Sequence, residues 1–209
     1  MSSLSFIASY LHESAELSLK LKEQEVQIEQ AIDAIFKAWL AGAPVFIIGN
    51  GGSASTATHF AADLVKTVIN NPDQRGVKAL ALVDNIPLVS ASTNDWGWGE
   101  AYTAALQAYW QEGGIVIGFS VHGGSGGEAG GIWSQNLLKA MQYAKDHRGT
   151  AIGFSGFDGG AMKNLSDISV IAEVNSTPLV ESFHVVLFHL ITFRLKEMIA
   201  DFYTKGSNK

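Results

Sequence analysis

The chain has 209 residues, no cysteine and a formal net charge of −6, with 47% hydrophobic and 16% charged residues. The acidic balance argues against binding to nucleic acid or to an anionic membrane surface, and the lack of cysteine excludes disulfides and thiolate chemistry. The length predicts a single domain over residues 1–209. Residues 1–20 lack the apolar core of a signal peptide, and no apolar run of about 18 residues predicts a membrane span, so we expect a cytoplasmic protein.

The N-terminal region, about residues 3–41, is predicted to be helical. Apolar residues recur at helical spacing over residues 4–19 and again over 26–40. Both apolar faces are wide for helices that flank a small domain. We therefore expect part of this surface to be buried against another copy of the chain.

Residues 44–200 alternate between short apolar stretches and helical ones. Nearly continuous apolar strands between helices are typical of a parallel sheet that is covered on both faces. The predicted fold is therefore α/β, a three-layer αβα sandwich of about five parallel strands with ligands at their carboxyl ends. The predicted strands are 45–48, 78–83, 115–119, 150–154 and 168–172, and the helices between and after them are 53–69, 85–92, 99–110, 134–146, 159–164 and 179–200.

A glycine-rich turn, Gly-Asn-Gly-Gly-Ser at residues 49–53, follows the first strand directly. Ser53 is a good N-cap for the helix that comes next, and the exposed N–H groups of such a turn favour a phosphate. The turn matches neither the nucleoside triphosphate motif nor the dinucleotide motif, in which Ala54 would be a third glycine. A small phosphorylated ligand is therefore favoured over ATP or NAD, and no nucleotide cofactor is expected. An ordinary tight turn without a ligand is the alternative.

A second glycine-rich loop, residues 120–134, follows the strand at 115–119 and contains six glycines. Its position at the end of a central strand predicts a second anion cradle that faces the first. Ser134 is predicted to cap the helix that follows. A flexible surface loop is the alternative.

Titratable residues on two helices form a third group. His59 and Asp63 have i, i+4 spacing and so share one face of the helix behind the first turn. Glu181, His184 and His189 lie in an otherwise apolar C-terminal helix, where polar groups need partners or a ligand. For His184, a core histidine without a functional role is the favoured interpretation.

The sequence from residue 49 to residue 64, with its Gly-Asn-Gly-Gly-Ser turn and a later His-Phe-Ala-x-Asp-Leu, closely resembles the sugar isomerase (SIS) domain family. Within the family, the phosphoheptose isomerases are the nearest match. The segments 94–98 (Asn-Asp-Trp-Gly-Trp) and 156–160 (Gly-Phe-Asp-Gly-Gly) also resemble family motifs, and the two tryptophans suit an interface, the core or a platform for the sugar. The resemblance implies a flavodoxin-like SIS fold.

The resemblance further implies an aldose–ketose isomerase that converts sedoheptulose 7-phosphate into a heptose 7-phosphate through an enediol. It gives acid–base roles to Asp63 and His189, and implies a homotetramer with sites between subunits. In some members a zinc ion is held at the positions of His59, Asp63, Glu181 and His189, although Glu181 and His189 lie about 12 Å apart along an ideal helix. The substrate-binding residues implied are Asn50, Gly51, Gly52, Ser53, Asn94, Asp95, Ser120, His122, Ser125, Ser134 and Glu181.

The chain departs from the family pattern in three places. Asp63 replaces a glutamate and is shorter by roughly 1.5 Å, and Glu181 replaces a glutamine and adds a negative charge. The second loop is longer than usual, and His122 stands where a hydroxyl residue is expected, to donate an N–H to the phosphate or to reach toward the sugar. Ser125 and Ser134 both remain candidates for phosphate binding. The alternative function is a non-catalytic SIS protein that binds a sugar phosphate or a protein partner.

Overall fold

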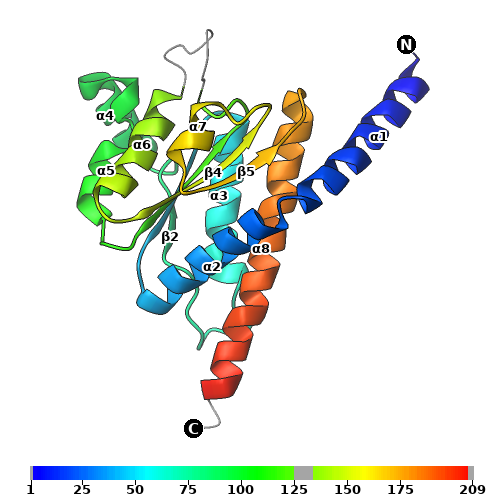
Figure 1. Ribbon diagram of the computed structural model, residues 1–209. Coiled ribbons are helices and arrows are strands. Elements are labelled where there is room, and N and C mark those ends of the chain that lie inside the picture. Colours follow the sequence, from blue (N-terminus) through cyan, green and yellow to red (C-terminus); the bar gives the residue numbers. More distant parts are fainter. Residues whose placement is uncertain (1, 125–133, 207–209) are drawn as a thin grey trace.

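The computed structural model describes residues 2–124 and 134–206, and it contains a five-stranded parallel sheet (Figure 1). The strand order is β2-β1-β3-β4-β5, which is the doubly wound order of flavodoxin-like folds. The α/β prediction is therefore confirmed. The strands are β1 Val45–Gly49, β2 Ala79–Ala81, β3 Ile115–Ser120, β4 Thr150–Gly156 and β5 Ile168–Ala172.

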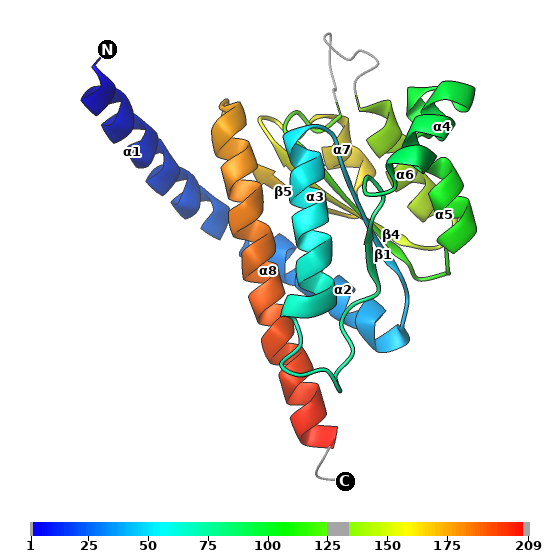
Figure 2. The ribbon, with the colours of Figure 1, turned by 180° about the vertical axis from the view of Figure 1, so that it is seen from behind.

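Helices cover both faces of the sheet (Figures 1 and 2). One face packs against α2, α3 and α8, and the other against α5, α6 and α7. The helices are α1 Ser3–Lys22, α2 Glu25–Ala41, α3 Gly52–Ala62, α4 Ile86–Trp96, α5 Thr103–Tyr109, α6 Gln135–Asp146, α7 Gly160–Leu165 and α8 Thr177–Gly206, with a π-helical turn η1 Asp63–Thr67 and a 3₁₀ turn η2 Trp98–Glu100.

Several expected boundaries are wrong. The helix predicted at 99–110 begins only at Thr103, after η2, and the α-helix predicted at 53–69 ends at Ala62, where η1 follows. The strand predicted at 78–83 is only the three residues of β2, because the chain turns after Ala81, where the N–H of Asp84 bonds back to the carbonyl of Ala81 at 3.2 Å. The helix predicted at 85–92 continues to Trp96, where Gly97 with a φ of 90° ends it. Asn94 therefore lies on a helix and not in a loop.

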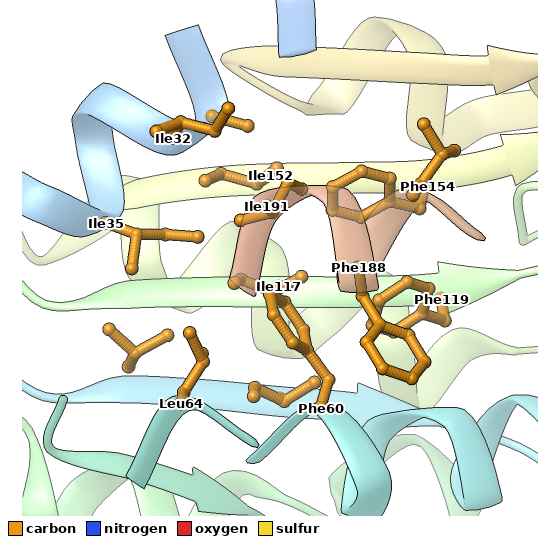
Figure 3. Packing of buried hydrophobic residues seen from close by; sticks show 14 of the residues in the cluster. Ile32, Ile35, Phe60, Leu64, Ile117, Phe119, Ile152, Phe154, Phe188 and Ile191 are labelled. Carbon is orange, nitrogen blue, oxygen red and sulfur yellow. The ribbon is translucent and has the colours of Figure 1, made fainter. Parts of the chain in front are cut away.

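The core between the sheet, α3 and α8 is aromatic and aliphatic (Figure 3). Phe60 of α3 stacks on Phe188 of α8 with ring centroids 5.3 Å apart, and it meets Phe119 of β3 edge-on at 6.0 Å. All three side chains are fully buried, and each such burial stabilises the fold by about 1.5–3 kcal/mol. This packing fixes α3 beside α8, and both helices carry candidate site residues.

The helix α8 is long and apolar enough, by length and composition, to cross a membrane over Thr177–Lys205. Half of that apolar window is buried inside the fold, where α8 packs against α2, α3 and β4. The core helix of a soluble protein meets the same criterion, so α8 is weak evidence for a span. Part of this long helix is buried against the sheet.

The helix α1 extends away from the rest of the chain, as both ribbon views show (Figures 1 and 2). Only Leu17 and Leu21, near its end, are buried. The exposed large hydrophobic residues on α1 are Leu4, Phe6, Ile7, Leu11 and Leu19. Its N-terminal half thus presents apolar surface that its own described chain does not cover.

Candidate active site

The site lies where the sheet order reverses. β1 and β3 are neighbours, and the loops after them lead to α3 on one face of the sheet and to α6 on the other. Ligands of open parallel sheets bind at such switch points, outside the carboxyl ends of the strands. A pocket is found there, lined by Asn50, Ser53, Phe119, Ser120, Val121, His122, Gly124, Ser134, Leu137 and Glu181.

The first turn has the strained backbone that the glycine pattern predicts. Gly51 has φ 55° and ψ −124°, a region that side-chain-bearing residues rarely occupy. Gly51 is also the N-cap residue of α3, so the expectation that Ser53 caps this helix is wrong. Ser53 is already helical, and its N–H bonds to the carbonyl of Asn50 at 3.0 Å. Ser53 is nevertheless one of the residues that line the pocket.

A pair of asparagines ties the first turn to α6. Asn50 Nδ2 donates to Asn136 Oδ1 at 3.0 Å, and Asn136 Nδ2 donates to Asn50 Oδ1 at 2.8 Å. Tyr102 lies beside them and donates its hydroxyl to the carbonyl of Gly49 at 3.0 Å. Burial raises the pKa of Tyr102, and its contact with Asn136 opposes that rise, so the hydroxyl stays a donor. The sequence pattern identified neither Asn136 nor Tyr102.

The second loop is described only at its two ends. Ser120 is buried, and its Oγ accepts from the N–H of Gly124 at 3.2 Å, so part of its bonding capacity is used within the loop. His122 is exposed and stacks near Phe157, with ring centroids 4.3 Å apart. The predicted phosphate residue Ser125 lies outside the described residues.

Ser134 stands at the N-cap position of α6, but its side chain makes no capping hydrogen bond, contrary to expectation. Its φ of 55° is left-handed, and this turns the hydroxyl toward the first turn, where Asn50 Nδ2 is 3.5 Å from Ser134 Oγ. Ser134 therefore lines the pocket from the side of the second loop.

Glu181 lies in the first two turns of α8 and reaches the N-terminal end of α3. A Cβ added at Gly52 would overlap Glu181 Oε1, so this carboxylate packs directly against the Gly52 backbone. Among the described residues that line the pocket, none is lysine or arginine. The pocket therefore combines a helix N-terminus, which favours anions, with one carboxylate, which repels them.

Two to three helical turns further along, α3 and α8 bring His59, Asp63 and His189 together. Asp63 Oδ2 lies 3.6 Å from His189 Nε2 and 3.9 Å from His59 Nε2. The two imidazole rings are 5.1 Å apart and nearly perpendicular. Side chains of both histidines are about half exposed, whereas that of Asp63 is 13% exposed.

These three residues can hold a divalent cation. Each offers one ligand atom, and the three atoms lie within 4.8 Å of one another. Zinc bound tetrahedrally by nitrogen and oxygen needs ligand atoms roughly 3.4 Å apart, close to the two separations from Asp63. Glu181 is not part of this group, so the structure joins three of the four predicted ligands and places the fourth in the pocket lined by Asn50 and Ser53.

Other predicted residues lie elsewhere. Asn94 and Asp95 are exposed on α4 and bond to each other at 2.8 Å, outside the pocket lining. His184 is 1% exposed, and it packs near Phe119. Burial lowers the pKa of His184 to about 4, against a smaller opposing effect of the Ser155 backbone. The neutral, buried ring fits the core role expected for it.

The fold and the pocket together define a flavodoxin-like α/β domain with a glycine-rich turn at the switch point. The chain belongs to the SIS domain family, whose model matches residues 9–154. A phosphoheptose isomerase of Helicobacter pylori is 30% identical over 182 residues, which cover 87% of this chain and 89% of that protein. The resemblance to phosphoheptose isomerases is therefore confirmed, and it supports an isomerase activity.

Another relative, the lincomycin biosynthesis protein LmbN of Streptomyces lincolnensis, is 41% identical over 161 residues. The match covers 75% of this chain but 57% of LmbN, so this chain spans less than two thirds of that protein. Among solved structures, a phosphoheptose isomerase from Francisella tularensis superposes with a TM-score of 0.82 over 94% of this chain and 100% of that one, at 24% identity. That similarity shows the fold.

Proposed function

We propose that this protein is an aldose–ketose isomerase that interconverts sedoheptulose 7-phosphate and a heptose 7-phosphate. The observation that carries the proposal is that the side chains of Asp63 and His189 lie close together, with 3.6 Å between Oδ2 and Nε2. The similarity to phosphoheptose isomerases over most of the chain supports the substrate class.

The spacing along α3 suits a long phosphosugar. Gly52 and His59 are seven residues apart, which is about 10 Å along a helix and two turns, so both lie on one side. The carbon chain of a heptose, with bonds of about 1.5 Å, covers most of that length when extended, and its phosphate adds to it. A triose phosphate is several ångströms too short. The phosphate end binds at the pocket, and the carbonyl end then reaches the Asp63 and His189 side chains.

The reaction requires one proton to move between two carbons. One of the two side chains removes a proton from the hydroxyl-bearing carbon C1, and the other protonates the oxygen on C2, which gives the enediol. Return of a proton to C2 and loss of the proton from the C1 hydroxyl gives the aldose. Remote binding at the phosphate holds the carbons in place for both transfers.

His59, Asp63 and His189 are the residues that would hold a divalent cation, and we propose zinc. When bound, it would polarise the carbonyl oxygen. His189 Nε2 is the atom that faces Asp63, so this nitrogen serves either as a ligand or as a proton carrier, but not as both at once.

The proposal is tested by assaying Asp63→Asn and His189→Ala with sedoheptulose 7-phosphate. We expect each variant to lose at least about 100-fold in kcat, because each removes a proton carrier. Asp201→Asn, on the exposed C-terminal part of α8, is the matched control and is expected to keep full activity. Full activity in both site variants would overturn the assignment. A wild-type protein that binds the phosphosugar without turnover would support the non-catalytic alternative.

We also propose that the chain, acting as one SIS domain, assembles into a cytoplasmic homotetramer. An apolar groove lies between the first two helices and α8, and it is lined in part by Leu21, Ile28 and Leu190. The C-terminal end of α1 lines this groove, and most exposed apolar residues of α1 lie earlier on the same helix, so a second copy can bury both surfaces in a self-complementary contact. Light scattering tests this: we expect four chains, and Leu11→Glu should reduce that number, whereas a monomeric wild type would contradict it.

A further inference from the structure

The backbone changes its hydrogen-bond pattern at Asp63. The α-helix α3 ends at Ala62, and residues Asp63–Thr67 form a π-helical turn in which the N–H of Val68 bonds to the carbonyl of Asp63 at 3.2 Å. This turn ends the helix, as π turns at helix C-termini do. Here the turn begins at the residue that faces both histidines.

Thr67, at the end of this turn, bonds to the side chain of Asp63. Thr67 Oγ1 donates to Asp63 Oδ1 at 2.8 Å. Helical serines and threonines usually bond to the backbone carbonyl four residues earlier, as Thr204 does with Ala200 in this chain. Thr67 instead bonds to the carboxylate.

The two carboxylate oxygens of Asp63 therefore have different partners. Oδ1 accepts from Thr67, and Oδ2 faces His59 and His189. The terminal torsion of aspartate has a broad energy minimum, so an unrestrained carboxylate would rotate. A hydrogen bond to one oxygen fixes the direction of the other.

We propose that Thr67 is a positioning residue for Asp63, which holds Oδ2 toward His189 and His59. The catalytic part of this inference rests on the proposed isomerase function. Such positioning matters more for Asp63 than for a glutamate. The aspartate side chain is one methylene shorter, so its carboxylate reaches His59 and His189 only from a narrow range of orientations. Groups that orient a ligand or a catalytic carboxylate change metal affinity or activity about 10- to 100-fold when removed.

Crystal structures of the wild type and of Thr67→Val test the geometry directly. Valine keeps the shape of threonine without the hydroxyl, so we expect the Asp63 carboxylate to rotate and Oδ2 to move away from His189 Nε2. An unchanged carboxylate in Thr67→Val would overturn the proposal. This comparison needs neither substrate nor metal, so it decides the role of Thr67 even if the protein proves not to be an isomerase.

Zinc titration and steady-state kinetics test the consequence. We expect Thr67→Val to lower zinc affinity and kcat by about 10-fold or more, with KM changed less than about twofold, and Thr67→Ser to restore most of both. Thr204→Val, which loses a hydroxyl bonded only to backbone, should match the wild type. If Thr67→Ser and Thr67→Val are equally impaired, or if Thr67→Val matches the wild type, the Thr67 hydroxyl does not position Asp63. If the wild type shows no turnover but the zinc titrations give the expected results, the isomerase assignment is rejected and the role of Thr67 is kept.

Discussion

The carboxylate of Glu181 lies against the backbone of Gly52, at the N-terminal end of α3, where the turn geometry favours a phosphate. A Cβ added at Gly52, the first residue of α3, would overlap Oε1 where it now lies, so an alanine there would require the Glu181 side chain to shift. The helix end thus already faces one negative charge of the protein itself. A phosphate that enters the pocket is therefore repelled by the Glu181 carboxylate.

Replacing this charge is expected to strengthen anion binding. Two unit charges about 4 Å apart repel by about 1 kcal/mol even in water, which corresponds to roughly fivefold in affinity. Glu181→Gln should therefore bind inorganic phosphate and sedoheptulose 7-phosphate at least about fivefold more tightly, measured by calorimetry. Glu197→Gln, on the exposed part of the same helix, controls for net charge. Weaker phosphate binding by Glu181→Gln would contradict the placement of this carboxylate in the anion site.

Alanine substitutions at Gly51 and at Gly52 should differ in their effect on the free energy of unfolding. Gly51 needs a backbone conformation reserved for glycine, so Gly51→Ala should cost roughly 1–3 kcal/mol in the free energy of unfolding. At Gly52 the added methyl group meets only the flexible end of Glu181, which can move aside. Gly52→Ala should therefore leave stability within about 1 kcal/mol of wild type. Chemical denaturation measures both, and equal losses would contradict this distinction.

The buried imidazole of His184 predicts a pH dependence of stability. Its pKa of about 4 in the folded state lies below the usual value near 6.5, so between these values the unfolded chain binds a proton that the folded chain does not. The free energy of unfolding therefore falls as pH drops below about 6.5, and this contribution amounts to about 2 kcal/mol between pH 7 and pH 5.

His184→Gln removes the titrating group and should flatten the pH dependence by that amount. Denaturant unfolding of both proteins at pH 7 and pH 5 measures the difference. His12→Gln, at an exposed site on α1, is the control and should change nothing. An identical pH dependence in His184→Gln and wild type would show that His184 is not held neutral by burial.

The reciprocal amide bonds between Asn50 and Asn136 predict coupling between the first turn and the start of α6. Each single alanine variant leaves the other amide without its partner in a part-buried place, which costs about 1–3 kcal/mol of stability. The double alanine variant should cost clearly less than the sum of the single ones. Strict additivity in a double-mutant cycle would mean that the pair does not tie the first turn to α6.

The main features of the fold follow from local patterns in the sequence. The strands at 115–120 and 150–156 are continuous apolar runs because both of their faces are buried, and such runs are visible without a structure. The end of β2 was not predictable in this way, because Leu82 and Val83 continue the apolar run although the chain turns there. The turn in which Asp84 bonds back to Ala81, and not composition, sets that boundary.

The candidate site was predictable where spacing within one helix determines proximity. The i, i+4 pair of His59 and Asp63 is an example, and Thr67 could have been found by the same rule, since it lies four residues beyond Asp63. The Asn50–Asn136 pair joins segments far apart in the chain, so no local pattern predicts it. Glu181 shows the opposite case: the family pattern assigned it both to the metal and to the substrate, and its carboxylate packs against the backbone of Gly52, apart from His59, Asp63 and His189. The roles of these residues in catalysis stay predictions.

Proton NMR of sedoheptulose 7-phosphate in D₂O, with the wild type and with Asp63→Asn, tests the central claim most directly. We expect the wild type to form the heptose 7-phosphate and to incorporate solvent deuterium at the carbon that receives the proton, and Asp63→Asn to do neither at a comparable rate. A wild-type protein that binds the ketose phosphate yet shows no product and no deuterium incorporation would contradict it.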